Sequence, residues 1–282
     1  MSTISSIHTP IVLTIAGSDS GGGAGIQADI KAISATGGYA CSVITAITAQ
    51  NTQGVSAVFP VPLTVVEQQL DAVFSDIPVL AVKIGMLADA PIITLVAKKL
   101  RQYQPKWIVL DPVMISTSGH HLLAAEAVET LKRELLPLAN LITPNLPEAA
   151  VLVGMTQQEW QQNPQQGIAA LSQLNTPAVL LKGGHDHQQA NSDDLLIQSG
   201  DSRHFCAPRI ATKNTHGTGC SLSSAIASYL AQGAKLVEAV DKAKQYIHQA
   251  IVHADQLRIG QGYGPIHHFY LLQIAKSQQK SQ

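Results

Sequence analysis

The chain has few of the residues that mark several large classes of protein. Among its 282 residues there are only three cysteines, and no Cys-x-x-Cys pair occurs. An odd number of widely separated cysteines cannot complete a disulfide framework, so we expect a reducing, cytoplasmic setting. Charged residues make up 13% of the chain, and the formal net charge is −1. Without a basic surplus, the sequence offers no surface that would attract nucleic acid.

Long apolar runs are missing as well. No uninterrupted apolar stretch approaches the ~18 residues that a membrane-spanning helix needs, so we expect no membrane partner. The first ten residues are polar and lack the charged and apolar regions of a signal peptide. What the chain does have is 45% hydrophobic residues, enough for a sizeable core. No repeat or low-complexity linker divides it, and we expect one domain over residues 1–282.

Short apolar runs alternate with helical patterns along the chain. Residues 11–16 are typical of a buried strand, and isoleucines then recur at helical spacing before a second strand over 40–49. Further strands are predicted over 81–86, 107–110, 141–143 and 178–182, with helices between them and a polar hairpin near 193–207. This alternation predicts an α/β fold, with helices on both faces of a doubly wound, mostly parallel sheet.

The stretch from Thr212 to Cys220 is the strongest candidate for a functional loop. It is a polar, glycine-bearing turn that runs directly into a helix of small and apolar residues. Gly217 and Gly219 allow a sharp turn, and the free N–H groups of the helix start favour an anion. The functional interpretation is a cradle for a phosphoryl group in transfer. The alternative is an ordinary glycine turn before a core helix.

Polar or glycine-bearing residues follow the predicted strands at their carboxyl ends, where ligands of α/β sheets bind. They are Gly17, Gln50, Met86, Asp111, Asn145 with Glu148, and Lys182. Asn145 and Glu148 have the spacing of a helix capping box, and they also have the oxygen chemistry to hold Mg²⁺. An acid, an amide, a lysine and a glycine-rich helix start on one sheet together indicate an active site.

Two other motifs are interpreted without a cofactor or metal. The segment from Gly23 to Ala28 matches a dinucleotide-binding pattern, but no acidic residue occurs between Asp29 and Glu67 to hold a ribose, which argues against an NAD-dependent oxidoreductase. His120 and His121 have no Cys or carboxylate at ligand spacing, so we expect them to face solvent. Asp29 itself either complements a helix N-terminus or accepts hydrogen bonds from a small polar ligand.

Several long blocks of the sequence resemble hydroxymethylpyrimidine/phosphomethylpyrimidine kinase, the thiamine-biosynthesis member of the ribokinase-like superfamily. The blocks are Ala16-Gly17-Ser18-Asp19, Gly22 to Asp29, Val43 to Ala46, Ala49 to Thr52, Lys83 to Leu87, Leu110 to Met114, Thr143 to Ala149, Lys182 to His185 and Asn214 to Cys220. The resemblance runs over about residues 11–269, leaving a polar N-terminal extension and a C-terminal tail outside it.

The resemblance implies a homodimeric enzyme that uses ATP and Mg²⁺. It would phosphorylate 4-amino-5-hydroxymethyl-2-methylpyrimidine and then convert the monophosphate to the diphosphate. The implied pyrimidine site is Gly17, Asp29, Thr48, Gln50, Met86, Val113 and Cys220, although family members often have Val at the position of Thr48. The implied nucleotide site is Asn145, Lys182, Lys213, Thr218 and Gly219. Asp111 and Glu148 would hold Mg²⁺, and the N–H groups of Gly217, Thr218 and Gly219 would meet the moving phosphoryl group.

Cys220 stands where sugar kinases of this superfamily carry an aspartate base. A thiol at a helix N-terminus can have a lowered pKa, so we hypothesise that Cys220 takes part of the role of a base; alternatively it only packs against the substrate. The competing function is a pyridoxal kinase of the same cysteine-bearing subgroup. Some of those enzymes use a second cysteine in the flap, and the predicted flap over 113–122 has none. A non-enzymatic binding module would leave Glu148, Lys182 and the glycine loop without a purpose.

Overall fold

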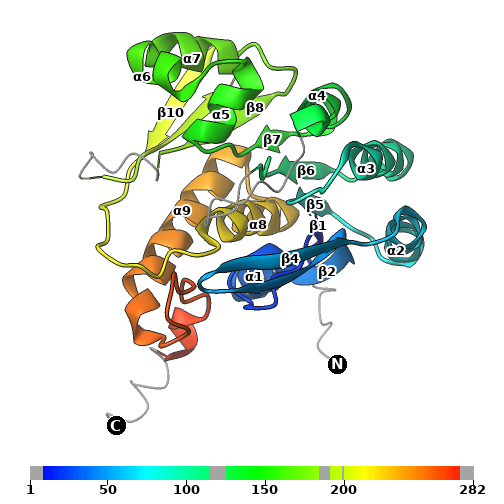
Figure 1. The fold of residues 1–282 in the computed structure, drawn as a ribbon, viewed down its shortest axis with the longest axis horizontal. Coiled ribbons are helices and arrows are strands. Elements are labelled where there is room, and N and C mark those ends of the chain that lie inside the picture. The colour runs from blue at the N-terminus through cyan, green and yellow to red at the C-terminus, as the bar shows by residue number, and fades with distance from the viewer. Residues whose placement is uncertain (1–8, 115–124, 184–190, 199, 274–282) are drawn as a thin grey trace, which may run out of the picture.

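The computed structural model describes residues 9–114, 125–183, 191–198 and 200–273. Its centre is an eight-stranded sheet of order β10-β9-β8-β7-β6-β5-β1-β2 (Figure 1). The strands are β1 (Ile11–Ala16), β2 (Tyr39–Ile44), β5 (Ala81–Ile84), β6 (Trp107–Leu110), β7 (Leu141–Ile142), β8 (Ala178–Lys182), β9 (Asp194–Gln198) and β10 (Asp201–Phe205). All neighbours from β2 to β8 in this order pair in parallel, and β9 runs antiparallel to both of its neighbours, β8 and β10.

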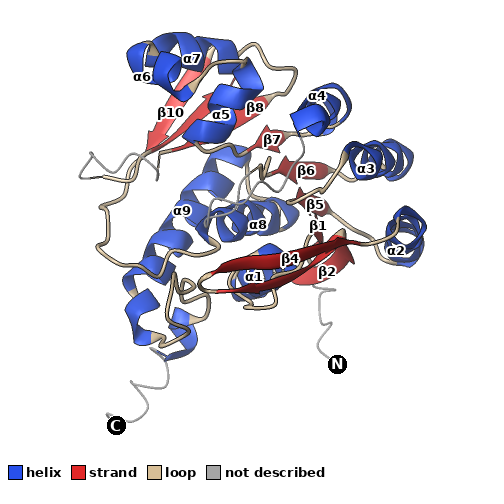
Figure 2. Ribbon diagram, in the orientation of Figure 1, coloured by secondary structure: helices blue, strands red, loops and turns tan. Residues whose placement is uncertain are grey.

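Helices cover both faces of this sheet (Figures 1 and 2). One face carries α1 (Gly25–Ala35), α8 (Thr218–Ala231) and α9 (Leu236–Val252), and the other carries α2 (Leu63–Asp76), α3 (Ala90–Tyr103), α4 (Ala125–Glu134), α5 (Leu146–Val153) and α7 (Pro164–Leu171). The short helix α6 (Gln157–Gln162) precedes α7, and two 3₁₀ turns follow α4 and α9 at Leu136–Leu138 and Ala254–Gln256. None of the helices in the described ranges is long and apolar enough to cross a membrane.

The alternation of side chains along each strand explains why the sheet has an apolar core on each of its two faces. In β1, Leu13 and Ile15 belong to the core under α2 to α5, whereas Val12 points to the opposite face and packs under α1, α8 and α9. Successive side chains of a strand alternate between faces, so a continuous apolar strand needs helices on both sides. The predicted doubly wound, mostly parallel sheet is thus confirmed.

Helix boundaries follow local chemistry. At the start of α3, the Asp89 carboxylate accepts a hydrogen bond from the Ile92 N–H at 2.9 Å, and Pro91 lies in the first turn. These features satisfy a free N–H group and fix the backbone angle that the helix needs. At the other end, Gln104 adopts a left-handed conformation with φ 48°, which stops the helix.

The predicted strand over residues 40–49 is wrong as one element. The chain breaks at Thr45, whose hydroxyl donates to the Met86 carbonyl at 2.8 Å. After this break, β3 (Ala46–Asn51) leaves the main sheet and pairs with β4 (Gly54–Pro60) in an antiparallel ribbon. Gln50 therefore lies on a separate ribbon and not at the end of a main-sheet strand. Neither β4 nor α6 was predicted.

Candidate active site

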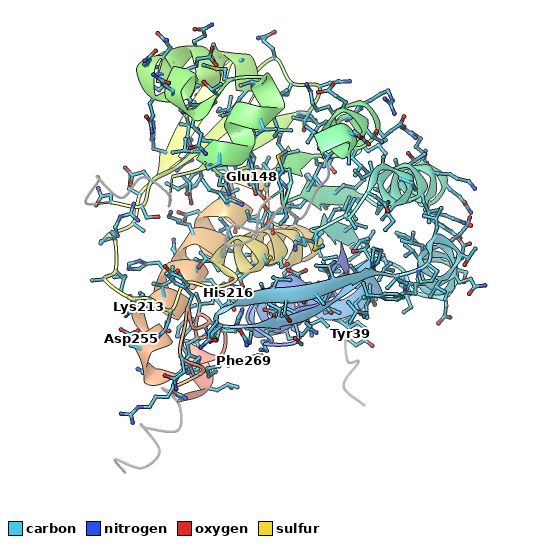
Figure 3. All side chains as sticks on the ribbon, viewed as in Figure 1. Tyr39, Glu148, Lys213, His216, Asp255 and Phe269 are labelled. Atoms are coloured by element: carbon cyan, nitrogen blue, oxygen red, sulfur yellow. The ribbon has the colours of Figure 1, made fainter. Side chains whose placement is uncertain are left out.

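A cavity of about 1030 Å³ lies at the carboxyl ends of the parallel strands, between the ribbon, the start of α8 and α9. Ligand sites of small molecules reach about this size. All the predicted site residues except Asp29 and Lys213 line it. Those lining the cavity are Gly17, Thr48, Gln50, Met86, Asp111, Val113, Asn145, Glu148, Lys182, Gly217, Thr218, Gly219 and Cys220. Figure 3 marks Glu148 at one end of this region and His216 at the other.

The loop before α8 has the geometry of an anion cradle. Gly217 is the N-cap of α8 with φ 78°, and no side-chain cap serves this helix within the part of the chain that the structure describes. A Cβ at Gly217 would lie 1.8 Å from the Gly23 carbonyl oxygen, so only glycine fits there. The N-terminus of α8 therefore presents N–H groups and the positive end of its dipole to the cavity.

A lysine stands next to this helix start. Lys182 Nζ lies 2.7 Å from Asp111 Oδ1, which also accepts a hydrogen bond from the Thr143 hydroxyl at 3.0 Å. A Cβ placed on Gly219 would be 3.3 Å from Lys182 Nζ and 3.7 Å from Asp111 Oδ2. Burial acts to lower the pKa of Lys182, but the nearby Asp111 and Glu148 outweigh it and raise that pKa. The cation is therefore charged and adjacent to the helix N-terminus.

Glu148 serves the fold and faces the cavity at once. Its carboxylate accepts from the Asn145 N–H at 2.8 Å, and Asn145 Oδ1 accepts from the Glu148 N–H at 2.9 Å. The predicted capping box is therefore confirmed. Burial and the nearby charge of Asp111 raise the pKa of Glu148 to about 7, against the lowering effect of Lys182. Asp111 and Glu148 thus lie in the same wall of the cavity, and the negative charge of one opposes ionisation of the other. Such a pair of carboxylates has the chemistry to bind a divalent cation.

At the floor of the cavity lies a second ion pair, of which Lys83 borders the cavity and Asp29 does not. Lys83 Nζ is 2.8 Å from Asp29 Oδ1, and both side chains are completely buried. The Asp29 carboxylate also accepts from the Thr14 and Ser224 hydroxyls, at 2.6 and 2.8 Å. The structure thus places Asp29 one layer below the cavity surface. A ligand would reach it only if this network opened.

The lowered pKa predicted for Cys220 is wrong. Burial raises the pKa of this thiol to about 11, and nearby Asp29 and Asp111 act in the same direction, while Lys83 opposes them only in part. The helix N-terminus does not prevail because desolvation penalises the thiolate more strongly. Cys220 lines the cavity as a neutral thiol at neutral pH.

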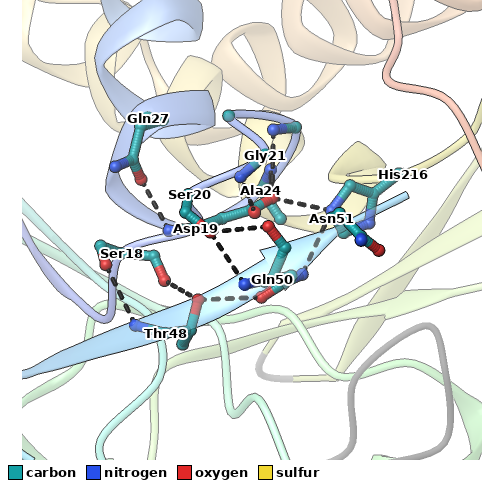
Figure 4. Close-up of polar contacts among 12 residues, drawn as sticks. Ser18, Asp19, Ser20, Gly21, Ala24, Gln27, Thr48, Gln50, Asn51 and His216 are labelled. Atoms are coloured by element: carbon teal, nitrogen blue, oxygen red, sulfur yellow. Dashed lines mark hydrogen bonds and ion pairs between the residues drawn. The ribbon is translucent and has the colours of Figure 1, made fainter. Parts of the chain in front are cut away.

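A polar cluster that the sequence did not predict joins the ribbon to the helix start (Figure 4). His216 Nε2 lies 2.8 Å from Asp19 Oδ2 and 3.3 Å from the Gln50 amide nitrogen. Thr48 Oγ1 contacts the Gln50 amide at 3.3 Å and donates to the Ser18 carbonyl at 2.8 Å. The only signal for this cluster was two polar residues in glycine-rich loops, separated by 197 positions.

The side of the cavity formed by the segment before α8 and by α9 includes several apolar residues. Pro208, Ala211, Ile247 and Ile251 line it, from the segment before α8 and from α9. The predicted Lys213 is exposed on the outer loop and does not line the cavity (Figure 3). Val113 does line it, whereas the remainder of the predicted flap, from residue 115 on, and both His120 and His121 lie outside the described residues. Among the described residues, no group of three or more His, Cys, Asp or Glu side chains could hold a metal.

Comparison with known proteins assigns this arrangement to a family. A hydroxymethylpyrimidine/phosphomethylpyrimidine kinase of Rhizobium meliloti is 53% identical over 262 residues, covering 93% of this chain and 98% of that protein. The protein of the same name from Escherichia coli is 48% identical over 258 residues, covering 92% and 97%.

Solved structures agree with the fold. An ADP complex of Bacillus subtilis pyridoxal kinase has a TM-score of 0.85 and 35% identity, covering 94% of this chain and 99% of that one. A phosphomethylpyrimidine kinase from Clostridium difficile has a TM-score of 0.71 and 46% identity, covering 86% and 99%. The family model described as phosphomethylpyrimidine kinase matches residues 19–267. The chain belongs to the phosphomethylpyrimidine kinase family, and its fold is ribokinase-like.

Proposed function

We propose that this protein transfers phosphate from ATP to 4-amino-5-hydroxymethyl-2-methylpyrimidine, and then to its monophosphate, in thiamine diphosphate biosynthesis. The observation that carries the proposal is the meeting of Lys182, Asp111 and Glu148 with the Gly217–Gly219 turn in one cavity. Relatives at about 50% identity bear the name of this activity.

The chemistry follows from the charges around the turn. Phosphoryl transfer passes through a loose transition state whose charge is spread over the phosphoryl oxygens, so catalysis is chiefly positioning and charge stabilisation. The N–H groups of Gly217 and Gly219 meet that charge from the helix end, whereas the predicted Thr218 N–H donates to the Thr215 carbonyl at 3.2 Å. Lys182 meets the charge as a point charge from β8. Because Cys220 is a neutral thiol, it does not take the proton of the substrate hydroxyl. In a loose transition state that proton passes to an oxygen of the transferred phosphoryl group as the new O–P bond forms and the bond to the ADP oxygen breaks.

Asp111 and Glu148 would suit a Mg²⁺ ion that has only a few protein ligands. Mg²⁺ in kinases keeps several waters and is bound through one or two carboxylates plus the nucleotide phosphates, and the pair offers such a site. When bound, the ion would neutralise charge on the phosphates. The raised pKa of Glu148 indicates a place where added positive charge is favourable. Nucleotide binding is supported by pyridoxal kinase neighbours solved with ADP and AMP-PCP.

The pyrimidine would lie between the ribbon and the end of β5. Gln50 offers an amide whose donor and acceptor match the amino group and ring nitrogen of an aminopyrimidine. Met86 lines the same region, and a Cβ on Gly17 would come 3.1 Å from its sulfur. A flat ring therefore fits beside a soft thioether and a residue without a side chain.

The ribbon also supports a homodimer. Its inner face carries Thr48 and Gln50 toward the cavity, whereas Ile47 and Phe59, which pair directly across it, are 47% and 65% exposed. Adjacent exposed apolar side chains on a soluble chain mark a contact surface, and a second copy is the partner that we propose. Three free cysteines support a cytoplasmic setting.

The second candidate is pyridoxal phosphorylation. It is favoured by the 30–35% identity to solved pyridoxal kinases, one of them in complex with pyridoxal. The higher identity to pyrimidine kinases and the absence of cysteine from residues 113–122 favour the pyrimidine.

Product mass spectrometry separates the two candidates. The protein is incubated with Mg-ATP and an equimolar mixture of hydroxymethylpyrimidine and pyridoxal. We expect the pyrimidine monophosphate first and the diphosphate later. Pyridoxal phosphate as the sole product would overturn the proposed function.

A further inference from the structure

We infer that Asp19, acting through His216, is a positioning residue that locks the phosphate-binding turn to the substrate side of the cavity. This inference rests on the proposed function, because it names how the two halves of that same site are held in register. Neither residue was expected to act in the site.

Asp19 is the centre of the N-terminal glycine loop. It is 1% exposed, and its carboxylate accepts hydrogen bonds from the N–H groups of Gly21, Gly23 and Ala24 at 2.8, 3.0 and 2.8 Å (Figure 4). Burial acts to raise its pKa, but the hydrogen bonds from His216, Ala24 and Gly21 outweigh burial and lower it. Asp19 is therefore an ionised carboxylate that shapes its own loop and has one remaining contact, His216.

His216 carries that contact into the phosphate-binding turn. It directly precedes Gly217, and its Nε2 lies 2.8 Å from Asp19 Oδ2. The two loops also interlock through their glycines, because a Cβ on Gly23 would lie 2.4 Å from His216 Cδ2. From the other side, the His216 N–H donates to the Gly264 carbonyl at 3.0 Å. A shift of Asp19 would thus move the start of α8 directly.

The same pair orients Gln50. An ionised Asp19 requires a proton on His216 Nε2, so the Gln50 amide nitrogen at 3.3 Å would face another donor. Turning the Gln50 side-chain amide by 180° places its oxygen beside His216 Nε2, where it accepts a hydrogen bond. The amide N–H then donates to the Thr48 hydroxyl oxygen, which is free to accept because that hydroxyl already donates its proton to the Ser18 carbonyl. One N–H and one lone pair then remain for the ligand. The hydrogen bond between Asp19 and His216 therefore selects the amide edge that faces the pyrimidine.

The test is a double-mutant cycle of Asp19→Ala and His216→Leu, with kinetics on whichever alcohol the wild type phosphorylates. Each single variant should lower kcat/KM for the alcohol by about 10- to 100-fold, as expected when reacting groups are misplaced. The double variant should be hardly worse than either single variant, because the two residues act as one unit. His216→Gln, which keeps a donor near the Nε2 position, should recover most of the loss.

The KM for the alcohol separates positioning from a merely structural role. A smaller folded fraction would lower the apparent kcat and leave KM unchanged, whereas displacement of Gln50 raises KM. His204→Leu and Asp201→Asn, both on exposed positions of β10, are the matched controls and should keep wild-type kinetics. Additive losses in the cycle, or an unchanged KM in both single variants, would overturn the inference.

Hydrogen exchange gives a readout that does not need activity. The amides of residues 214–219 should exchange faster in Asp19→Ala than in the wild type, and those of β10 should not. If the wild type phosphorylates neither alcohol, the proposed function fails while this measurement still decides the inference. Equal exchange of that turn in variant and wild type would refute it.

Discussion

Two buried lysine–aspartate pairs of this molecule have the same chemistry and opposite settings. Lys83 borders the cavity floor and Asp29 lies behind it, both with no exposed side-chain surface, whereas Lys182 and Asp111 line the cavity wall at 12% and 3% exposure. The sealed pair is surrounded by protein partners, and the open pair adjoins the helix start that would receive a phosphate. The difference teaches that burial alone does not indicate a catalytic role. We propose that the surface a pair exposes to the cavity decides which pair supports the fold and which one acts on the substrate.

The largest expected effect is on the sealed pair. Lys83→Met should lower the free energy of unfolding by about 3–5 kcal/mol, because it leaves the Asp29 charge buried without a cation. Urea denaturation measures this loss. Adding Asp29→Asn to Lys83→Met should recover a large part of it, because the amide oxygen can still accept from Thr14 and Ser224. A single variant as stable as the wild type would show that the pair does not stabilise the fold.

The next effect is on the open pair. Lys182→Met should reduce kcat by about 10²- to 10³-fold, the usual cost of removing one preorganised group that stabilises transition-state charge. Its free energy of unfolding should change by less than about 1 kcal/mol, because water in the cavity can hydrate Asp111. Steady-state kinetics and urea denaturation of the same preparation measure both. Lys132→Met, on the outer surface of α4, is the matched control.

Glu148, the carboxylate beside the Lys182–Asp111 pair, should make the stability of the protein depend on pH. The pKa of Glu148 is about 7 in the fold against an ordinary value of 4.5, so the folded protein binds the proton more tightly than the unfolded chain. Stability of the metal-free protein should therefore fall as pH rises from about 4.5 to 7, by about 3 kcal/mol at most from this group.

Denaturation curves at several pH values, for the wild type and Glu148→Gln, test this. The variant should lack this share of the pH dependence, and Mg²⁺ at pH 8 should stabilise the wild type more than the variant. Identical pH profiles would mean that Glu148 is not the group that titrates.

The smallest effect is at Cys220. Because its pKa is about 11, the thiol is neutral at pH 7, and Cys220→Ala should lower kcat by less than about tenfold. Cys206→Ala, which changes an exposed cysteine, is the control. A loss of a thousandfold in Cys220→Ala alone would restore the thiol as a base.

The strands and most helices could be predicted because their signals are local. The apolar run of β1 and the capping residues Asn145 and Glu148 each carry their information within a few positions. The break at Thr45 could not be predicted, since the β-branched run continues through it and the break depends on a hydrogen bond to Met86, 41 positions away.

Individual residues of the site could be predicted from the sequence, but the contacts between distant loops could not. Strand-end polarity identified Lys182, Asp111 and Glu148, which do meet in the cavity. The contact between Asp19 and His216 had no local signal because the fold alone brings these loops together. The pKa of Cys220 was predicted in the wrong direction because a local rule for helix N-termini says nothing about how deeply a thiol is buried.

The most direct test measures kcat and the free energy of unfolding for Lys182→Met and Lys83→Met side by side. The account predicts that Lys182→Met loses activity and keeps its stability, whereas Lys83→Met loses stability first. If Lys182→Met kept wild-type kcat, or if the two variants lost activity and stability in equal proportion, the distinction between an acting pair and a supporting pair would be contradicted.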